Sequence, residues 1–181
     1  MKTIFKIITF LTLLFFSISN LLGQSACSYT ESEITIELNG WDISRTDYTH
    51  EKFIEVTGLD NNSQLTYSGE KDTEEFGYPW YYYGLGESYF NFAGVMDNQG
   101  DYNGLKRIFS FKIKKRGKLN VNGIQVGDTV DDLKAHFNHF DFCTKTNEGK
   151  KSLILRYSYQ SLIFEISPNG KIKVIELYSP I

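Results

Sequence analysis

A short motif occurs twice in this chain, and its repetition constrains the fold more than any other feature of the sequence. Residues 38–43 (LNGWDI) and 121–126 (VNGIQV) share the order aliphatic, Asn, Gly, large apolar, polar, aliphatic. A threonine suited to cap a helix follows each copy, at Thr49 and Thr129. Runs of residues that are typical of strands follow each predicted helix. Internal repetition of this kind predicts two similar structural units in tandem.

Each unit is predicted to contain one strand, one short helix and then about three antiparallel strands. In the first unit the helix follows Thr49 and ends at Gly58, and Ile34, Ile36 and Leu38 form the strand before it. Polar residues at 59–75 and 95–103 predict long loops, the first with one strand near Leu65. Strands are expected at 80–83, 89–92 and 109–113.

The second unit shows the same order more compactly. Thr129 and Asp132 have the spacing of a capping box, and Val130, Leu133 and Phe137 form an apolar stripe. Strands are expected at 153–159, 162–166 and 172–177, with turns at Asn169-Gly170 and, in the first unit, Asn103-Gly104. Strands in runs with one helix on a face define an α+β fold, whose sheet keeps its other face open.

The N-terminus has the pattern of a secretory signal peptide over residues 1–23. Lys2 and Lys6 precede an apolar run that is too short to cross a membrane. We therefore expect an exported protein, periplasmic or extracellular, with an N-terminal segment at 24–33 and α+β repeats at 34–116 and 117–181. Cleavage after Gly23 and cleavage after Ala26 both stay open, and the second would leave Cys27 available for acylation, as in an outer-membrane lipoprotein. No later segment is predicted to span a membrane.

The chain has two cysteines, Cys27 and Cys143. In an exported protein they are candidates for a disulfide, which would close a long loop and contribute about 4–5 kcal/mol in the chain-entropy account. An acylated Cys27 with a free Cys143, or two unpaired thiols, are the alternatives.

The charge of the chain argues against a nucleic-acid partner. Formal net charge is −3, and it becomes −5 once Lys2 and Lys6 are removed with the signal peptide. Nucleic-acid binding depends on many Lys and Arg contacts to phosphates. One local basic run stands out, and we expect it to protect the edge of a strand. It consists of Lys112, Lys114, Lys115, Arg116 and Lys118.

A cluster of aromatic residues between positions 76 and 92 supplies the candidate binding residues. On a strand, Trp80 and Tyr82 point to one face, and Tyr81 and Tyr83 point to the other, so only one of these pairs can belong to the core. Together with Tyr89 they are our candidate site. Tyr and Trp dominate binding hot spots and also stack on sugars. The alternatives are a protein or peptide surface, a glycan surface, and core packing with cross-strand pairs.

No catalytic or metal-binding set is recognisable, so we predict a protein that is not an enzyme and has no cofactor and no metal. His136, His139, Asp141 and Cys143 match no closed zinc pattern, and residues 97–104 lack the terminal acid of a calcium loop. An enzyme acting on glycans through Glu74, Glu75 and Asp101 is the alternative class, and it requires two carboxylates that face each other.

Residues 124–133 (IQVGDTVDDL), followed by Leu162–Ile166 (LIFEI), carry a family resemblance. They resemble the small repeats of the β-lactamase inhibitor proteins (BLIP-like domains) and of outer-membrane assembly lipoproteins of the SmpA/OmlA kind. A more general similarity is to bacterial domains of unknown function that contain this repeat. The resemblance implies tandem helix-and-sheet repeats and protein binding on an open sheet.

The resulting hypothesis is an exported, non-enzymatic binding protein whose partner is a protein or peptide, with a glycan as a further option. The alternative functions are a glycan-active enzyme and a structural envelope protein or lipoprotein. The sequence leaves the oligomeric state open.

Overall fold

The structure, a computed structural model, describes residues 35–43, 50–59, 65–71, 80–96, 102–117, 119–157 and 160–179. Within these residues two helices, α2 (His50–Thr57) and α4 (Val130–His136), accompany a set of mostly longer strands. The strands are β1 (Glu37–Leu38), β2 (Trp41–Asp42), β3 (Leu65–Lys71), β4 (Trp80–Leu85), β5 (Ser88–Met96), β6 (Tyr102–Ile113), β7 (Cys143–Asn147), β8 (Lys150–Tyr157), β9 (Gln160–Ile166) and β10 (Ile172–Tyr178). The predicted α+β class is confirmed, with strands predominating.

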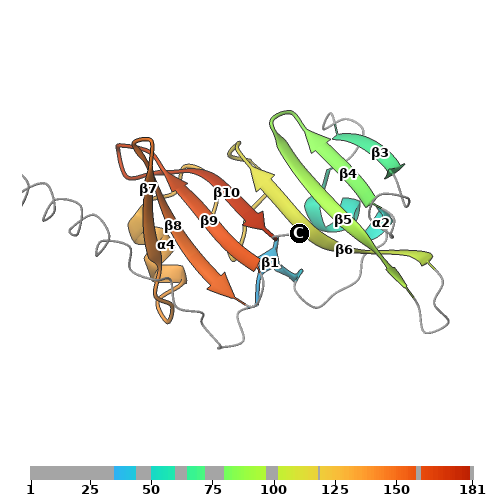
Figure 1. The fold of residues 1–181 in the computed structure, drawn as a ribbon, viewed down its shortest axis with the longest axis horizontal. Coiled ribbons are helices and arrows are strands. Elements are labelled where there is room, and N and C mark those ends of the chain that lie inside the picture. The colour runs from blue at the N-terminus through green and yellow to red at the C-terminus, as the bar shows by residue number, and fades with distance from the viewer. Residues whose placement is uncertain are drawn as a thin grey trace, which may run out of the picture.

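Eight of the strands form one antiparallel sheet in the order β3-β4-β5-β6-β10-β9-β8-β7. The four strands on one side follow α2 in the chain, and the four on the other side follow α4. Both helices lie behind the sheet in Figure 1, so they share one of its faces. We call the opposite face the open face. The two groups of strands meet where Phe111–Ile113 of β6 pair with Ile175–Leu177 of β10, and we call this pairing the seam.

The prediction of about three strands after each helix was wrong, because each helix is followed by four. The strand that was not predicted is β7, whereas β3 contains the strand expected near Leu65; the two are the edges of the sheet. In β7 the residues from Thr144 to Asn147 are exposed, so this strand has no apolar face to produce an alternating pattern. In place of the single strand expected before the first helix, the structure has a short hairpin of β1 and β2. The prediction of a turn at Asn103-Gly104 was also wrong, because both residues lie inside β6.

The prediction that the basic run protects the edge of a strand was also wrong. β6 lies in the interior of the sheet, between β5 and β10, so its lysines do not protect an edge. Lys112 forms an ion pair with Glu176 across the seam, at 2.8 Å. Lys114 to Arg116 lie beyond the end of the strand. Lys118 is outside the described residues.

A single core joins the two halves on the helix side of the sheet. Phe53 of α2 has its ring centroid 4.7 Å from that of Tyr83 and about as close to the rings of Phe90 and Phe92. At the end of α4, Phe137 packs 5.8 Å from Phe164 of β9. Each such ring, when fully buried, contributes about 1.5–3 kcal/mol through the apolar area that it removes from water.

The capping box predicted for the second helix is confirmed. The Thr129 hydroxyl accepts a hydrogen bond from the Asp132 backbone N–H, and an Asp132 carboxylate oxygen accepts one from the Thr129 N–H at 3.0 Å. Hydrogen bonds from the Thr129 side chain and backbone lower the pKa of Asp132. They favour its charged form, which also suits the positive end of the helix dipole.

The two copies of the repeated motif bind each other directly. The backbone N–H of Asn39 donates to the carbonyl of Asn120 at 3.0 Å, and the N–H of Asn122 donates to the carbonyl of Glu37 at 2.9 Å. The side-chain oxygen of Asn122 accepts from the Glu37 N–H at 3.0 Å, and that of Asn39 accepts from the Asn120 N–H at 2.9 Å. These four bonds therefore form two equivalent pairs, one from each copy of the motif. We call this arrangement the Asn-Gly clasp.

The two turns of the clasp also have the same backbone conformation. Asn39 and Gly40 have φ angles of 53° and 79°, and Asn122 and Gly123 have 50° and 79°. Asparagine and glycine adopt this left-handed region at low cost, which explains why both copies use them. Between the turns, Leu38 pairs with Val121, and both side chains are fully buried.

Replacing either clasp asparagine should destabilise the fold as a whole. Asn39→Gly and Asn122→Gly keep the positive φ but leave a part-buried N–H without its acceptor, so each should lower the free energy of unfolding by about 1–3 kcal/mol. Because both side chains belong to one network, the double variant should lose less than the sum of the single losses. Urea unfolding followed by circular dichroism measures these values.

Asn138→Gly is the matched control, because this exposed residue lies just beyond α4 and reports the cost of glycine alone. Wild-type unfolding midpoints in both single variants, or strictly additive losses, would show that the clasp does not couple the two halves.

Candidate functional site

The structure separates the five aromatic candidates into two groups. Tyr83 is 0% exposed, and Tyr81 is half-buried against the core, so both lie on the helix side. Tyr82 is 39% exposed, and its ring stacks on that of Tyr89 with centroids 6.2 Å apart and planes at 25°. Trp80 is half-buried and meets Phe109 edge-on at 4.7 Å. The open face therefore takes Trp80, Tyr82 and Tyr89, while Tyr83 contributes to the core and is not available to a partner.

A row of side chains crosses the open face from the first half of the sheet to the second. Tyr89 of β5 is opposite Lys112, and Lys112 is opposite Glu176 across the seam. Glu176 is opposite Ile163 of β9, which is opposite Ile154 of β8. All five are half-buried. The row combines an aromatic ring, a compensated ion pair and two aliphatic side chains.

A shallow hollow of about 410 Å³ lies on this face beside the seam. Its walls include Trp80 and Phe109 from the first half and Tyr178 from the second. On its floor the Asn91 side-chain amide donates to the Ser110 hydroxyl at 3.0 Å. Aromatic walls can hold an apolar or aromatic side chain of a partner, and the polar groups between them can form hydrogen bonds with neighbouring polar groups of that partner.

Tyr178, which is 51% exposed, was missed by the sequence analysis. It lies far along the chain from the aromatic cluster, and only the sheet order brings it to the same hollow. One signal was present: alternation along the strand predicted at 172–177 places Tyr178 on the face opposite Leu177.

The electrostatics of the row keep its tyrosine neutral and its ion pair intact. Burial raises the pKa of Tyr89, and the nearby Glu176 carboxylate raises it further. Burial acts to lower the pKa of Lys112, but its hydrogen bond to Glu176 and the charge of that carboxylate outweigh this effect and raise it. At neutral pH the face thus presents a hydroxyl donor beside a neutralised pair of charges.

The remaining sequence candidates form no second centre in the described part of the chain. Cys143 is half-buried at the start of β7 and disulfide-bonded. Its expected partner Cys27 lies outside the described residues, so the pairing stays a prediction. Glu74, Glu75 and Asp101 also lie outside them. No group of three His, Cys, Asp or Glu side chains within the described ranges is placed to hold a metal ion.

Comparisons with protein-family profiles, curated proteins and solved structures give no match to this chain. In the ranges that the structure covers, neither helix has the length and apolar character needed to span a bilayer. The candidate site is therefore identified from its geometry alone, which is that of a sheet with aromatic rings on its open face.

Removing the carboxylate from the seam should weaken it in a pH-dependent manner. Glu176→Gln should lower the pKa of Lys112 and reduce the free energy of unfolding by up to about 1 kcal/mol at neutral pH. A raised lysine pKa stabilises the fold below the unfolded value, and this stability is lost as pH rises through the folded value. The gap between variant and wild type should therefore shrink above pH 10.5. Urea unfolding at stepped pH measures it.

Glu55→Gln is the control, since it removes an exposed ion pair with Lys52 on α2. It should change stability by a few tenths of a kcal/mol at most. A gap for Glu176→Gln that widens at alkaline pH would contradict the assigned sign.

Proposed function

We propose that this chain is an exported binding protein, built from two tandem helix-and-sheet repeats, that holds a protein or peptide partner on the open face of its sheet. The single observation that carries the proposal is the pair of exposed tyrosines, Tyr82 and Tyr178, contributed by different halves to one sheet face. Tyrosines provide large, rigid contact area with a polar tip.

The repeat part of the proposal is supported by equivalences between the halves. Each helix precedes four strands, and the two sets run outward from the seam in mirrored order. The clasp pairs equivalent atoms of the two motifs. A duplicated scaffold of this kind is also what the resemblance to the inhibitor and assembly-lipoprotein repeats implies, and that relationship remains part of the proposal.

The binding part is supported by the physical character of the open face. Its aromatic residues are on paired strands in the middle of a sheet, so little side-chain or backbone freedom is lost when a partner binds. Lys112 and Glu176 neutralise each other at its centre. A face with no strong net charge at its centre favours a partner that supplies apolar side chains and hydrogen bonds.

Truncating the exposed tyrosines should weaken partner binding without affecting the fold. The exported protein is used as bait on envelope extract and culture supernatant of the organism that produces it, and the captured protein is then purified. For Tyr82→Ala and Tyr178→Ala we expect the Kd for that protein to rise about 30-fold each, the equivalent of a 2 kcal/mol hot spot. Biolayer interferometry measures it.

His139→Ala is the control, because it removes an exposed ring just beyond α4 and should leave the Kd unchanged. Equal Kd values for the wild type and both tyrosine variants would exclude the open face as the binding surface. A glycan array probed with the same variants tests the other partner class, and tyrosine-dependent glycan binding would replace the protein partner while keeping the face.

A further inference from the structure

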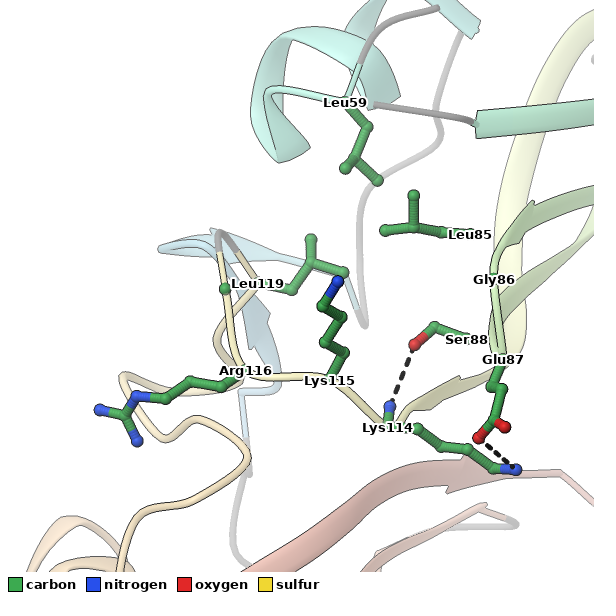
Figure 2. Close-up of a pocket in the computed structure, with 10 residues that line it drawn as sticks. Leu59, Leu85, Gly86, Glu87, Ser88, Lys114, Lys115, Arg116 and Leu119 are labelled. Atoms are coloured by element: carbon green, nitrogen blue, oxygen red, sulfur yellow. Dashed lines mark hydrogen bonds and ion pairs between the residues drawn. The ribbon is translucent and has the colours of Figure 1, made fainter. Parts of the chain in front are cut away.

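A second cavity lies away from the open-face hollow, where the chain passes from β6 toward the second half. It has a volume of about 500 Å³ and lies between the β4–β5 turn and residues 114–117. Figure 2 shows Leu59, Leu85 and Leu119 gathered around it from three separate segments of the chain. The volume is within the range of small-molecule sites, about 300–1,000 Å³.

The apolar side of this cavity is built on the core. Leu59 and Leu119 are 3% and 5% exposed and belong to the core cluster, and Leu85 packs against that cluster. Residues 114–117, which follow β6, are held to the β4–β5 hairpin because the Lys114 N–H donates to the Ser88 hydroxyl at 3.0 Å. Ser88 is itself buried. The cavity is therefore formed before any ligand enters, which lowers the entropic cost of binding.

Three cationic side chains from the described residues border the cavity, and two of them are already engaged. Lys114 pairs with Glu87 at 3.4 Å. Arg116 pairs with Asp128 at 2.7 Å and also donates to the Val126 carbonyl.

Lys115 differs from both. It has no ion pair with any residue in the part of the chain that the structure describes. Its side chain is exposed and lines the cavity, and Figure 2 shows it directed toward Leu119. One uncompensated positive charge next to an apolar wall is complementary to a ligand with one negative charge and an alkyl chain.

We propose that this cavity binds a medium-chain alkyl carboxylate, a fatty acid, with the carboxylate on Lys115 and the chain against the three leucines. The site is distinct from the open face and does not depend on the function proposed for it.

Octanoate below its micellar concentration is the probe, titrated into the exported protein and followed by ¹H–¹⁵N spectra. Amide signals of Gly86, Ser88, Gly117 and Leu119 should shift together and saturate. Along the series butanoate, hexanoate and octanoate the affinity should rise up to about fourfold per methylene, as expected for burial of alkyl surface. Octanol should bind at least tenfold more weakly than octanoate, and octylammonium should not shift these signals.

Lys115→Gln should raise the Kd for octanoate about tenfold, and Lys115→Arg should restore most of the affinity. Lys145→Gln is the matched control, since this exposed lysine lies on the edge strand β7. Leu85→Ala should weaken octanoate more than butanoate. Two results would overturn the proposal: octanoate leaving the four amide signals unmoved, or binding Lys115→Gln as tightly as the wild type.

Discussion

The Asn-Gly clasp is the interaction on which the joining of the two halves depends. The seam of the sheet has only three residue pairs, Phe111–Ile113 with Ile175–Leu177. The clasp adds a second connection, and it satisfies the N–H groups of Glu37 and Asn120 with asparagine side chains. Part-buried backbone groups left without partners are costly, so few other residues can replace the asparagines of the clasp turns. That constraint explains why the motif was visible in the sequence.

Sequence patterns predicted the elements that have both a buried and an exposed face. The α4 helix, with its Thr129 cap and its Leu133 and Phe137 stripe, and strand β9, with alternating burial from Gln160 to Ile166, were predicted because their environment differs between the two sides. The edge strand β7 was missed for the opposite reason. Residues 144–147 of β7 are exposed, and only backbone pairing with β8 makes them a strand. Because these residues are exposed on both faces of the strand, their sequence has no apolar periodicity that predicts a strand.

The sequence identified the aromatic residues of the candidate site, but it did not show which of them lie on the open face and which in the core. Alternation along β4 separates Trp80 and Tyr82 from Tyr81 and Tyr83, but it cannot say which pair is covered. The packing of Phe53 of α2 against Tyr83 decides this question, and a contact between a helix and a strand so far apart in the chain leaves no trace in local sequence. Tyr178 joins Trp80 in one hollow for the same kind of reason, because β10 enters the sheet beside β6.

The basic run shows how one short segment contributes to two different sites. Lys112 points to the open face and Ile113 to the core, as the alternation of β6 requires. After the strand ends, Lys114 and Arg116 pair with acidic side chains, whereas Lys115 has no acidic partner among the described residues. In the proposed duplicated scaffold, the connection between two copies occurs once, whereas the sheet face extends over both. A cavity lined by that connection therefore arises from the join itself, and its ligand need not be related to the partner held by the sheet. The charges that looked like a single feature of the sequence thus belong to two chemically different sites, one compensated and one not.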